Sequence, residues 1–186
     1  MHVSLEEYID QRQLRYLRDK RRLALVMAYS VLQSICSGKI NMPVEKASVF
    51  FYTLTDEKYD LTRPFLKTDL QMRTGSLVAP LSEPHRVSII LELGILLLEI
   101  HTGQPLMSLA SDVEKQNMTA DARVEFAKRV VLDLPDCGEP YANAIMACLE
   151  LAWATSFEIH ELEMSIGLYT NVISPIEREL ECLFHL

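Results

Sequence analysis

The sequence predicts a mostly α-helical protein that forms a single domain over residues 1–186, with a short β element at residues 48–55. Two observations favour this class. Apolar residues recur three and four positions apart through most of the chain, which is the spacing of helical faces. Glycine is scarce, at 6 residues, while 49% of residues are hydrophobic and 24% are charged, as in a globular chain with a sizeable core.

The first helix is expected at residues 11–37, where apolar side chains form one stripe and Gly38 can end the helix. Residues 39–86 change character, because prolines interrupt them repeatedly. We expect loops there, apart from the segment SVFFYTLT at residues 48–55. Its β-branched and aromatic residues predict a short strand.

Residues 87–100 are apolar on nearly every side, so we expect the buried central helix of the domain there. Its few polar residues, Ser88, Glu92 and Glu99, fall on one narrow face, and Gly103 suits its end. Thr119 can cap a further helix to about residue 134, and Pro140 suits the first turn of the next. Their expected inward residues are Ala120, Val124, Ala127, Val131, Leu134, Tyr141, Ile145, Cys148, Leu149 and Ala152.

The last segment, residues 159–183, carries apolar residues that alternate three and four apart, which is typical of the seam between packed helices. Pro175 lies inside this stripe, and Ser174 with Glu177 fits a capping box, so we expect a break or kink near Ser174. We interpret the stripe as core. The alternative is a homo-oligomer seam.

Composition disfavours several classes of function. The net charge of -8 argues against nucleic acid as a partner, because binding phosphates requires a cationic surface. No secretory signal opens the chain, and no apolar run reaches the about 20 residues that cross a bilayer. The 4 cysteines, Cys36, Cys137, Cys148 and Cys182, form no Cys-x-x-Cys pair, so we expect free buried thiols and a cytoplasmic location.

No local motif for catalysis is present: the sequence lacks a Gly-rich phosphate loop and a Gly-x-Ser-x-Gly nucleophile elbow. We therefore assign no catalytic residue, no cofactor and no metal site. His160 and Glu163 lie one helical turn apart, but two ligands do not make a metal site, and a solvated polar face is the preferred interpretation. His101, near the end of the central helix, is expected to have a structural role.

Two groups of polar residues remain as candidates for binding. A basic face on the first helix could dock a phosphate, an anionic membrane or an acidic partner, although a solvated face paired to nearby acids is preferred. Its residues are Arg12, Arg15, Arg18, Lys20, Arg21 and Arg22, and the acids are Glu6, Glu7, Asp10 and Asp19. A loop-built polar pocket in residues 39–86 would gather Asp56, Asp60, Arg63 and Asp69, and would indicate a small enzyme of unusual type.

Residues 93–106 read LGILLLEIHTGQPL and resemble the central helix of the protein-kinase C-terminal lobe. Residues 28–35 and 140–149 are similar to other helices of that lobe. The chain resembles more closely a family of uncharacterised fungal proteins that carry a degenerate kinase-like region, often behind a prion-inhibition (HeLo-type) domain. That resemblance rests on residues 3–7 (VSLEE), 141–149 (YANAIMACL) and 172–177 (VISPIE).

The departures from the kinase pattern bear on function. A kinase requires a catalytic-loop Asp and an Asn that binds magnesium, but the aligned positions hold Asn41, Met42, Pro43 and Ser48. The Asp that opens the central kinase helix is Ile89 here. The resemblance therefore implies a catalytically inactive, pseudokinase-like module that binds a protein partner. Fungal self-recognition or immunity-type signalling is the setting that the resemblance implies.

Overall fold

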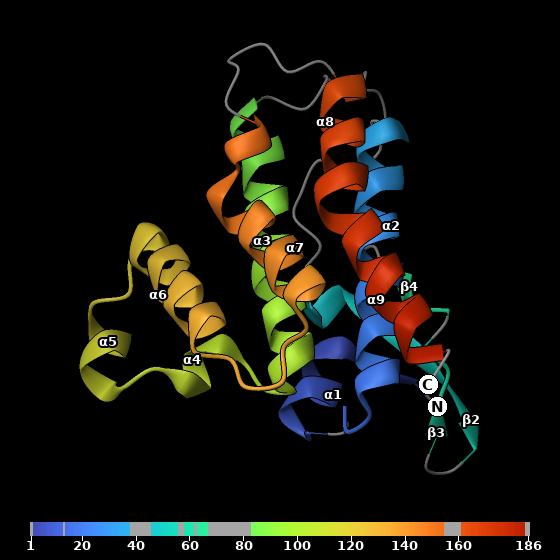
Figure 1. The fold of residues 1–186 in the computed structure, drawn as a ribbon. Helices are drawn as coiled ribbons and strands as arrows, with labels where there is room; N and C mark the ends of the chain where they lie inside the picture. Colours follow the sequence, from blue (N-terminus) through green and yellow to red (C-terminus); the bar gives the residue numbers. More distant parts are fainter. Residues whose placement is uncertain are drawn as a thin grey trace, which may run out of the picture.

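The computed structural model describes residues 2–12, 14–37, 46–55, 58–61, 63–66, 83–154 and 161–184. Over these residues the protein is mostly helical, with a small antiparallel sheet at one end (Figure 1). The helical class and the β element predicted at residues 48–55 are confirmed. Among the described helices, none combines the length and the apolar character needed to cross a membrane.

The sheet joins the start of the chain to the segment after the first long helix. Strand β2 (Val49–Thr55) pairs antiparallel with β1 (His2–Ser4), β3 (Lys58–Tyr59) and β4 (Phe65–Leu66). The turn η1 (Lys46–Ser48) directly precedes β2. Val3 lies opposite Phe51, and both side chains are buried. The N-terminal strand is therefore part of the folded core and not a loose extension.

The helix predicted to begin at residue 11 begins later. A short helix α1 (Leu5–Asp10) comes first, started by a capping box in which Ser4 and Glu7 exchange side-chain and backbone hydrogen bonds. Arg12 then adopts a left-handed backbone with φ 53°, which ends the turn, and α2 runs over Leu17–Ser37. The apolar pattern alone could not place this break, because it continues through it.

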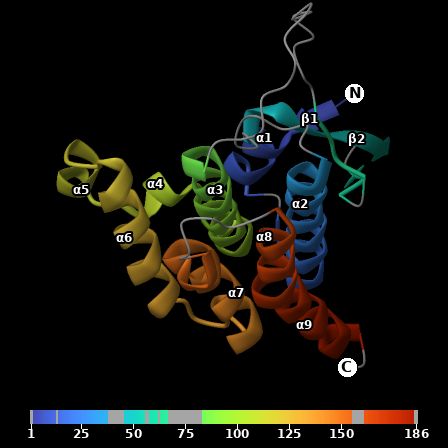
Figure 2. The ribbon, with the colours of Figure 1, turned by 90° about the horizontal axis from the view of Figure 1, so that it is seen from above.

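Helix α3 (Glu83–Thr102) is the predicted buried centre. It packs against α2 on one side and against α6 (Ala120–Leu132) and α7 (Glu139–Glu150) on the other (Figure 2). Ile90, Leu97 and Leu98 of α3 are fully buried. Gly94 allows α7 to approach closely, since a Cβ added there would lie 2.7 Å from Cys148 Cβ. Gly103, with φ 69°, ends the helix as expected.

The caps predicted for α6 and α7 are confirmed, because Thr119 accepts a hydrogen bond from the N–H of Ala122 and Pro140 lies in the first turn of α7. Most predicted inward residues are buried or half-buried. Ala120 and Ala152 are exposed instead, because Ala120 opens α6 and Ala152 lies beyond α7 in η2 (Ala152–Ala154). Short helices α4 (Leu106–Leu109) and α5 (Asp112–Gln116) were not predicted.

The sequence predicts a break or a kink near Ser174; the helix is not broken there, but an irregular π-helical segment ends directly before it. Helix α8 (Glu161–Leu168) continues through a π-helical segment η3 (Tyr169–Ile173) into α9 (Ser174–Phe184), and Ser174 itself has helical dihedral angles. A π turn holds more residues than an α turn, so it rotates the apolar face. The buried side chains are Met164, Leu168, Val172, Ile173 and Ile176.

This rotation divides the stripe predicted at residues 159–183. Its second half reaches the core through Ile173 and Ile176, whereas Leu162, Ile166 and Tyr169 are 71%, 56% and 44% exposed. The prediction that the whole stripe is core is therefore wrong for its first half. Its first member, Ile159, lies outside the described residues.

The cysteines are free thiols, but they are not uniformly buried. Cys148 is buried in the contact of α7 with α3, and Cys137 is half-buried. Cys36 and Cys182 are exposed, contrary to expectation, because each lies near the C-terminal end of its helix.

Candidate functional site

A buried ionic network ties the helices together around Arg21 of α2. The Arg21 side chain is 0% exposed, and its Nε donates to Glu179 Oε1 of α9 at 2.6 Å. Glu179 Oε2 accepts the backbone N–H of Tyr141 at 3.0 Å, and the Arg21 guanidinium lies 3.5 Å from the Tyr141 ring centroid. One guanidinium therefore links α2, α7 and α9 through charge, hydrogen bonds and a cation–π contact.

The network includes His101 at the C-terminal end of α3. Arg21 Nη1 lies 3.0 Å from His101 Nδ1, so Nδ1 accepts, and the ring's other nitrogen donates to the carbonyl of Pro135. Burial, then the charges of Arg21 and Lys20, lower the pKa of His101 to about 4. The imidazole is therefore neutral at pH 7, and its two nitrogens are occupied by structural contacts. The structural role predicted for His101 is consistent with this geometry.

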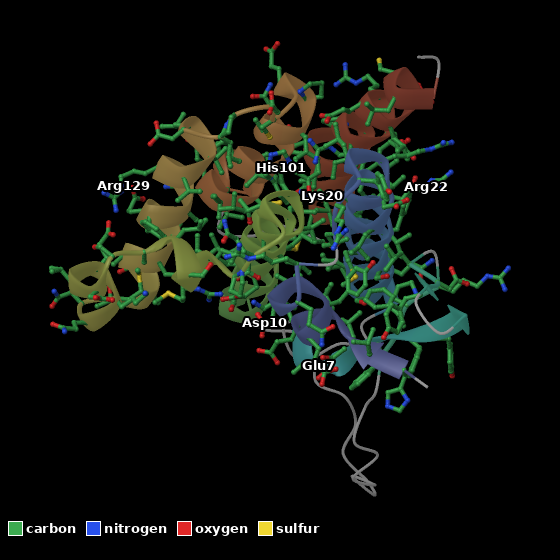
Figure 3. All side chains as sticks on the ribbon, turned by 90° about the horizontal axis from the view of Figure 1, so that it is seen from below. Glu7, Asp10, Lys20, Arg22, His101 and Arg129 are labelled. Carbon is green, nitrogen blue, oxygen red and sulfur yellow. The ribbon has the colours of Figure 1, made fainter. Side chains whose placement is uncertain are left out.

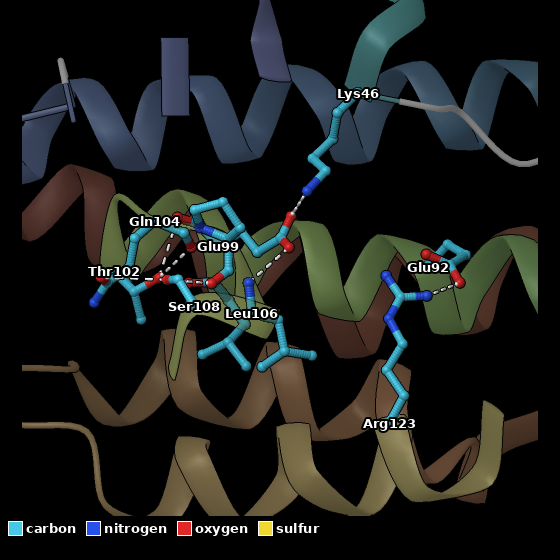
Figure 4. A network of polar contacts seen from close by, with 10 residues as sticks. Lys46, Glu92, Glu99, Thr102, Gln104, Leu106, Ser108 and Arg123 are labelled. Atoms are coloured by element: carbon cyan, nitrogen blue, oxygen red, sulfur yellow. Dashed lines mark hydrogen bonds and ion pairs between the residues drawn. The ribbon is translucent and has the colours of Figure 1, made fainter. Parts of the chain in front are cut away.

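A second polar cluster includes Glu92 and Glu99, which lie on the narrow polar face predicted for α3 (Figure 4). Glu99 is 3% exposed; its Oε1 accepts the N–H of Leu106 at 2.8 Å, and its Oε2 lies 2.6 Å from Lys46 Nζ. Glu92 pairs with Arg123 of α6 at 2.6 Å. Both carboxylates therefore hold neighbouring segments against α3.

Beside the first network, a pocket of about 460 Å³ opens where the start of α2 meets the end of α3 and the α6–α7 connection. Figure 3 shows Lys20 and His101 side by side at this place, away from Arg22 and Arg129. The polar side of the pocket consists of Arg15, Lys20, His101, Thr102, Gln104 and Asp136. The apolar side consists of Leu17, Leu109, Leu134 and Pro135.

Lys20 connects the pocket to the protein interior. Its Nζ donates to the backbone carbonyl of His101 at 2.6 Å, at the end of α3 where the helix dipole favours a cation. Burial and the neighbouring Arg21 charge lower the pKa of Lys20. The neighbouring positive charge favours the approach of an anion, because a negative group would offset it.

The basic run predicted as one solvated face is divided by the structure. Arg21 is entirely buried, which corrects its predicted exposure. Arg15 and Lys20 line the pocket, and Arg12 Nη2 reaches Gln104 Oε1 of the same pocket at 3.5 Å. Among the acids expected to pair with this run, Glu7 instead caps α1 through Ser4, which lowers the pKa of Glu7.

The other candidate residues do not converge in the described part of the chain. Asp60 donates its backbone N–H to Tyr52, Arg63 is exposed, and Asp56 and Asp69 lie outside the described residues, so the loop-built pocket stays a prediction. His160 lies outside them as well, and Glu163 is exposed. Among the described residues, no group of three metal-ligating side chains occurs.

The structure describes only some of the positions that the kinase resemblance aligns with the catalytic loop. Asn41, Met42 and Pro43 lie outside the described residues, while Ser48 ends the short turn η1. Ile89, which the resemblance aligns with the Asp of the kinase helix, lies on α3 and is buried in the core at 3% exposure.

These features define a helical protein whose buried ionisable groups hold its helices together and whose surface carries a small pocket of mixed charge. The chain belongs to the family described as Domain of unknown function (DUF7580), which matches residues 2–182. Comparison with curated proteins and with solved structures gave no match.

Proposed function

We propose that this protein is a catalytically inactive, pseudokinase-like module that acts by binding a protein partner. The observation that carries the proposal is the engagement of its buried polar groups. The charges of Arg21, Glu179 and Glu99 and the ring nitrogens of His101 are engaged in contacts between segments of the fold. Arg21 Nη2 is the exception, because it is buried without a hydrogen-bond partner in the described residues. Groups fixed in this way support a rigid framework, and they are not poised to transfer protons or phosphoryl groups.

The kinase-like part of the proposal is supported by α3. Gly94 sits in close contact with α7, Glu99 accepts the N–H of Leu106 after the Thr-Gly turn, and Ile89 fills the position of the kinase Asp with a buried apolar side chain. This combination favours a retained packing framework without its catalytic residues. A role in fungal self-recognition or immunity-type signalling, as the resemblance implies, belongs to the same proposal.

Nucleotide binding tests this function directly. Isothermal titration of the full chain with ATP is run with magnesium and again with EDTA, beside an active protein kinase as the positive control. We expect no magnesium-dependent heat and no transfer of labelled phosphate to the chain or to a general kinase substrate. Magnesium-dependent ATP binding, or phosphate transfer above the blank, would overturn the inactive assignment.

Self-association is a further proposal, and it depends on the exposed first half of the apolar stripe. Leu162, Ile166 and Tyr169 lie on the outer side of α8 and η3, which is the kind of surface that a second helix can cover. Sedimentation equilibrium should show a dimer that Ile166→Asp converts to a monomer. A monomer at all concentrations would refute the seam and leave the binding-module proposal untouched.

A further inference from the structure

We propose that the pocket between α2, α3 and the α6–α7 connection binds an acidic peptide segment of a protein partner. A carboxylate of the segment contacts Arg15 and Lys20, and an adjacent apolar side chain packs on the leucine side of the pocket. This inference rests on the proposed function in one respect, since it names the partner class of the binding module.

The two cations of the pocket retain unused capacity for hydrogen bonding. Arg15 is exposed, and in the described part of the chain it has no ion-pair partner. Lys20 Nζ makes one hydrogen bond, to the His101 carbonyl, in the same part of the chain. An ammonium carries three N–H donors and a guanidinium carries five, so both side chains can still donate to a carboxylate.

The placement of Arg15, just before the N-terminus of α2, disfavours a purely structural role. The positive end of the α2 dipole lies at Leu17, where acids and not cations are stabilising. Arg12 adopts a left-handed φ of 53° while its side chain reaches Gln104 of the pocket, and Asp136 of the lining has φ 59°. Left-handed backbone at non-glycine residues is unfavourable and concentrates at ligand sites.

The local charge opposes the charge of the whole chain. The lining holds two cations, Arg15 and Lys20, and one carboxylate, Asp136; His101 is neutral and adds no charge. The pocket is therefore net positive, whereas the chain carries a net charge of -8. A positive pocket on an otherwise negative surface attracts an acidic segment and directs it to the pocket. The single carboxylate of Asp136 would repel a ligand that places a second anionic group on that side of the pocket.

The shape and lining favour a peptide over other anionic partners. A volume of about 460 Å³ accommodates a few side chains, and Leu17, Leu109 and Leu134 provide an apolar wall for one of them. The lining contains no Phe, Tyr or Trp ring on which a nucleic-acid base could stack, and its imidazole, His101, is buried against Tyr141. A concave pocket of this volume also matches a side chain better than it matches the flat surface of a membrane.

The test uses isothermal titration of the full chain with two end-capped synthetic peptides. One alternates leucine and glutamate, and the other carries glutamine in place of each glutamate. We expect the glutamate peptide to bind, its affinity to fall as salt is added, and the glutamine peptide to bind at least about tenfold more weakly.

Substitutions at matched exposed cations locate the binding. Arg15→Glu should weaken binding of the glutamate peptide by about tenfold or more, and Arg15→Lys should retain most of it. Arg63→Glu makes the same charge change at an exposed residue outside the lining, and it should change the affinity by less than about twofold. Circular dichroism verifies that each variant is folded.

Several results would overturn the peptide site. These are equal binding of the two peptides, no binding of the glutamate peptide, and an equal loss for Arg15→Glu and Arg63→Glu. Arg15-dependent binding to anionic vesicles without peptide binding would likewise replace the peptide with a membrane. If the peptides fail while ATP also fails to bind, this inference falls and the proposed function stands.

Discussion

Removing Glu179 should destabilise the protein more than any surface substitution, because it leaves the buried charge of Arg21 without its partner. Glu179 is 8% exposed, and one of its oxygens accepts from Arg21 Nε at 2.6 Å while the other accepts the N–H of Tyr141 at 3.0 Å. Glu179→Ala therefore leaves the buried guanidinium of Arg21 without its carboxylate, whereas the Tyr141 N–H keeps the Gly138 carbonyl as an acceptor at 3.0 Å. Breaking a buried ion pair in this way costs about 3–5 kcal/mol.

A loss of that size is a large part of the about 5–15 kcal/mol that typically stabilises a folded protein. Urea unfolding, followed by far-ultraviolet circular dichroism and by the fluorescence of the single tryptophan, Trp153, measures it. Glu181→Ala provides the matched control, since Glu181 lies on the same helix and is exposed. The control should change the free energy of unfolding by less than about 0.5 kcal/mol.

The double variant Arg21→Met/Glu179→Leu separates charge from packing. Because it removes the buried cation together with its partner, it should recover at least half of the stability lost in Glu179→Ala. The reasoning would be refuted if Glu179→Ala were as mild as Glu181→Ala. If the double variant recovers no stability, the loss in Glu179→Ala comes from packing and from the hydrogen bond of the Tyr141 N–H, not from the unpaired charge.

Two further predictions concern α3. Gly94→Ala should lower the free energy of unfolding by about 1–2 kcal/mol, because a Cβ would lie 2.7 Å from Cys148 Cβ. This overpacking outweighs the better helix propensity of alanine. An unchanged free energy of unfolding in urea would contradict the prediction. The His101 pKa of about 4 is below its unfolded value of about 6.5, so stability should fall by up to about 3 kcal/mol as pH falls from 6.5 to 4. His101→Gln should flatten that slope, whereas exposed His2→Gln should leave it unchanged.

The sequence predicted helix boundaries correctly where a capping residue next to the boundary determines them. Thr119 accepts the N–H of Ala122 three residues later, and Gly103 takes the positive φ that ends α3, so each boundary depends on residues next to it. The nearly uniform apolar character of residues 87–100 predicted burial for the same reason. A helix without a polar side has to lie inside the protein.

The buried ion pair of Arg21 could not be predicted from neighbouring residues. Its partner Glu179 lies 158 positions away, so no spacing in the first helix reveals the pair. One signal was available, however, because Arg21 falls four residues after Leu17 and three before Ala24, on the apolar stripe itself. A charged residue at an inward position predicts a buried partner, even when the sequence does not identify it.

The division of the last stripe has a different cause. Alternating spacings of three and four fit a straight α-helix; Pro175 predicted an irregularity near Ser174, but not that it would be a π turn. The turn is favoured by packing, since it brings Met164, Leu168, Val172 and Ile176, each four positions apart, onto one buried line. A spacing of four drifts around a regular α-helix, but the wider π turn compensates for the drift.

The candidate pocket could not be predicted because three distant segments build it, yet its chemistry follows from two consecutive residues of α2. Arg21 points inward and holds His101 neutral, while Lys20 lines the pocket and caps α3. Since the imidazole is neutral above about pH 6, the positive charge of the pocket lining comes from Arg15 and Lys20, with Arg12 nearby at Gln104. Ligand affinity at this site should therefore respond to salt, and His101 should add no pH dependence to it above pH 6, whereas the contribution of His101 to stability is lost as pH falls below 6.5.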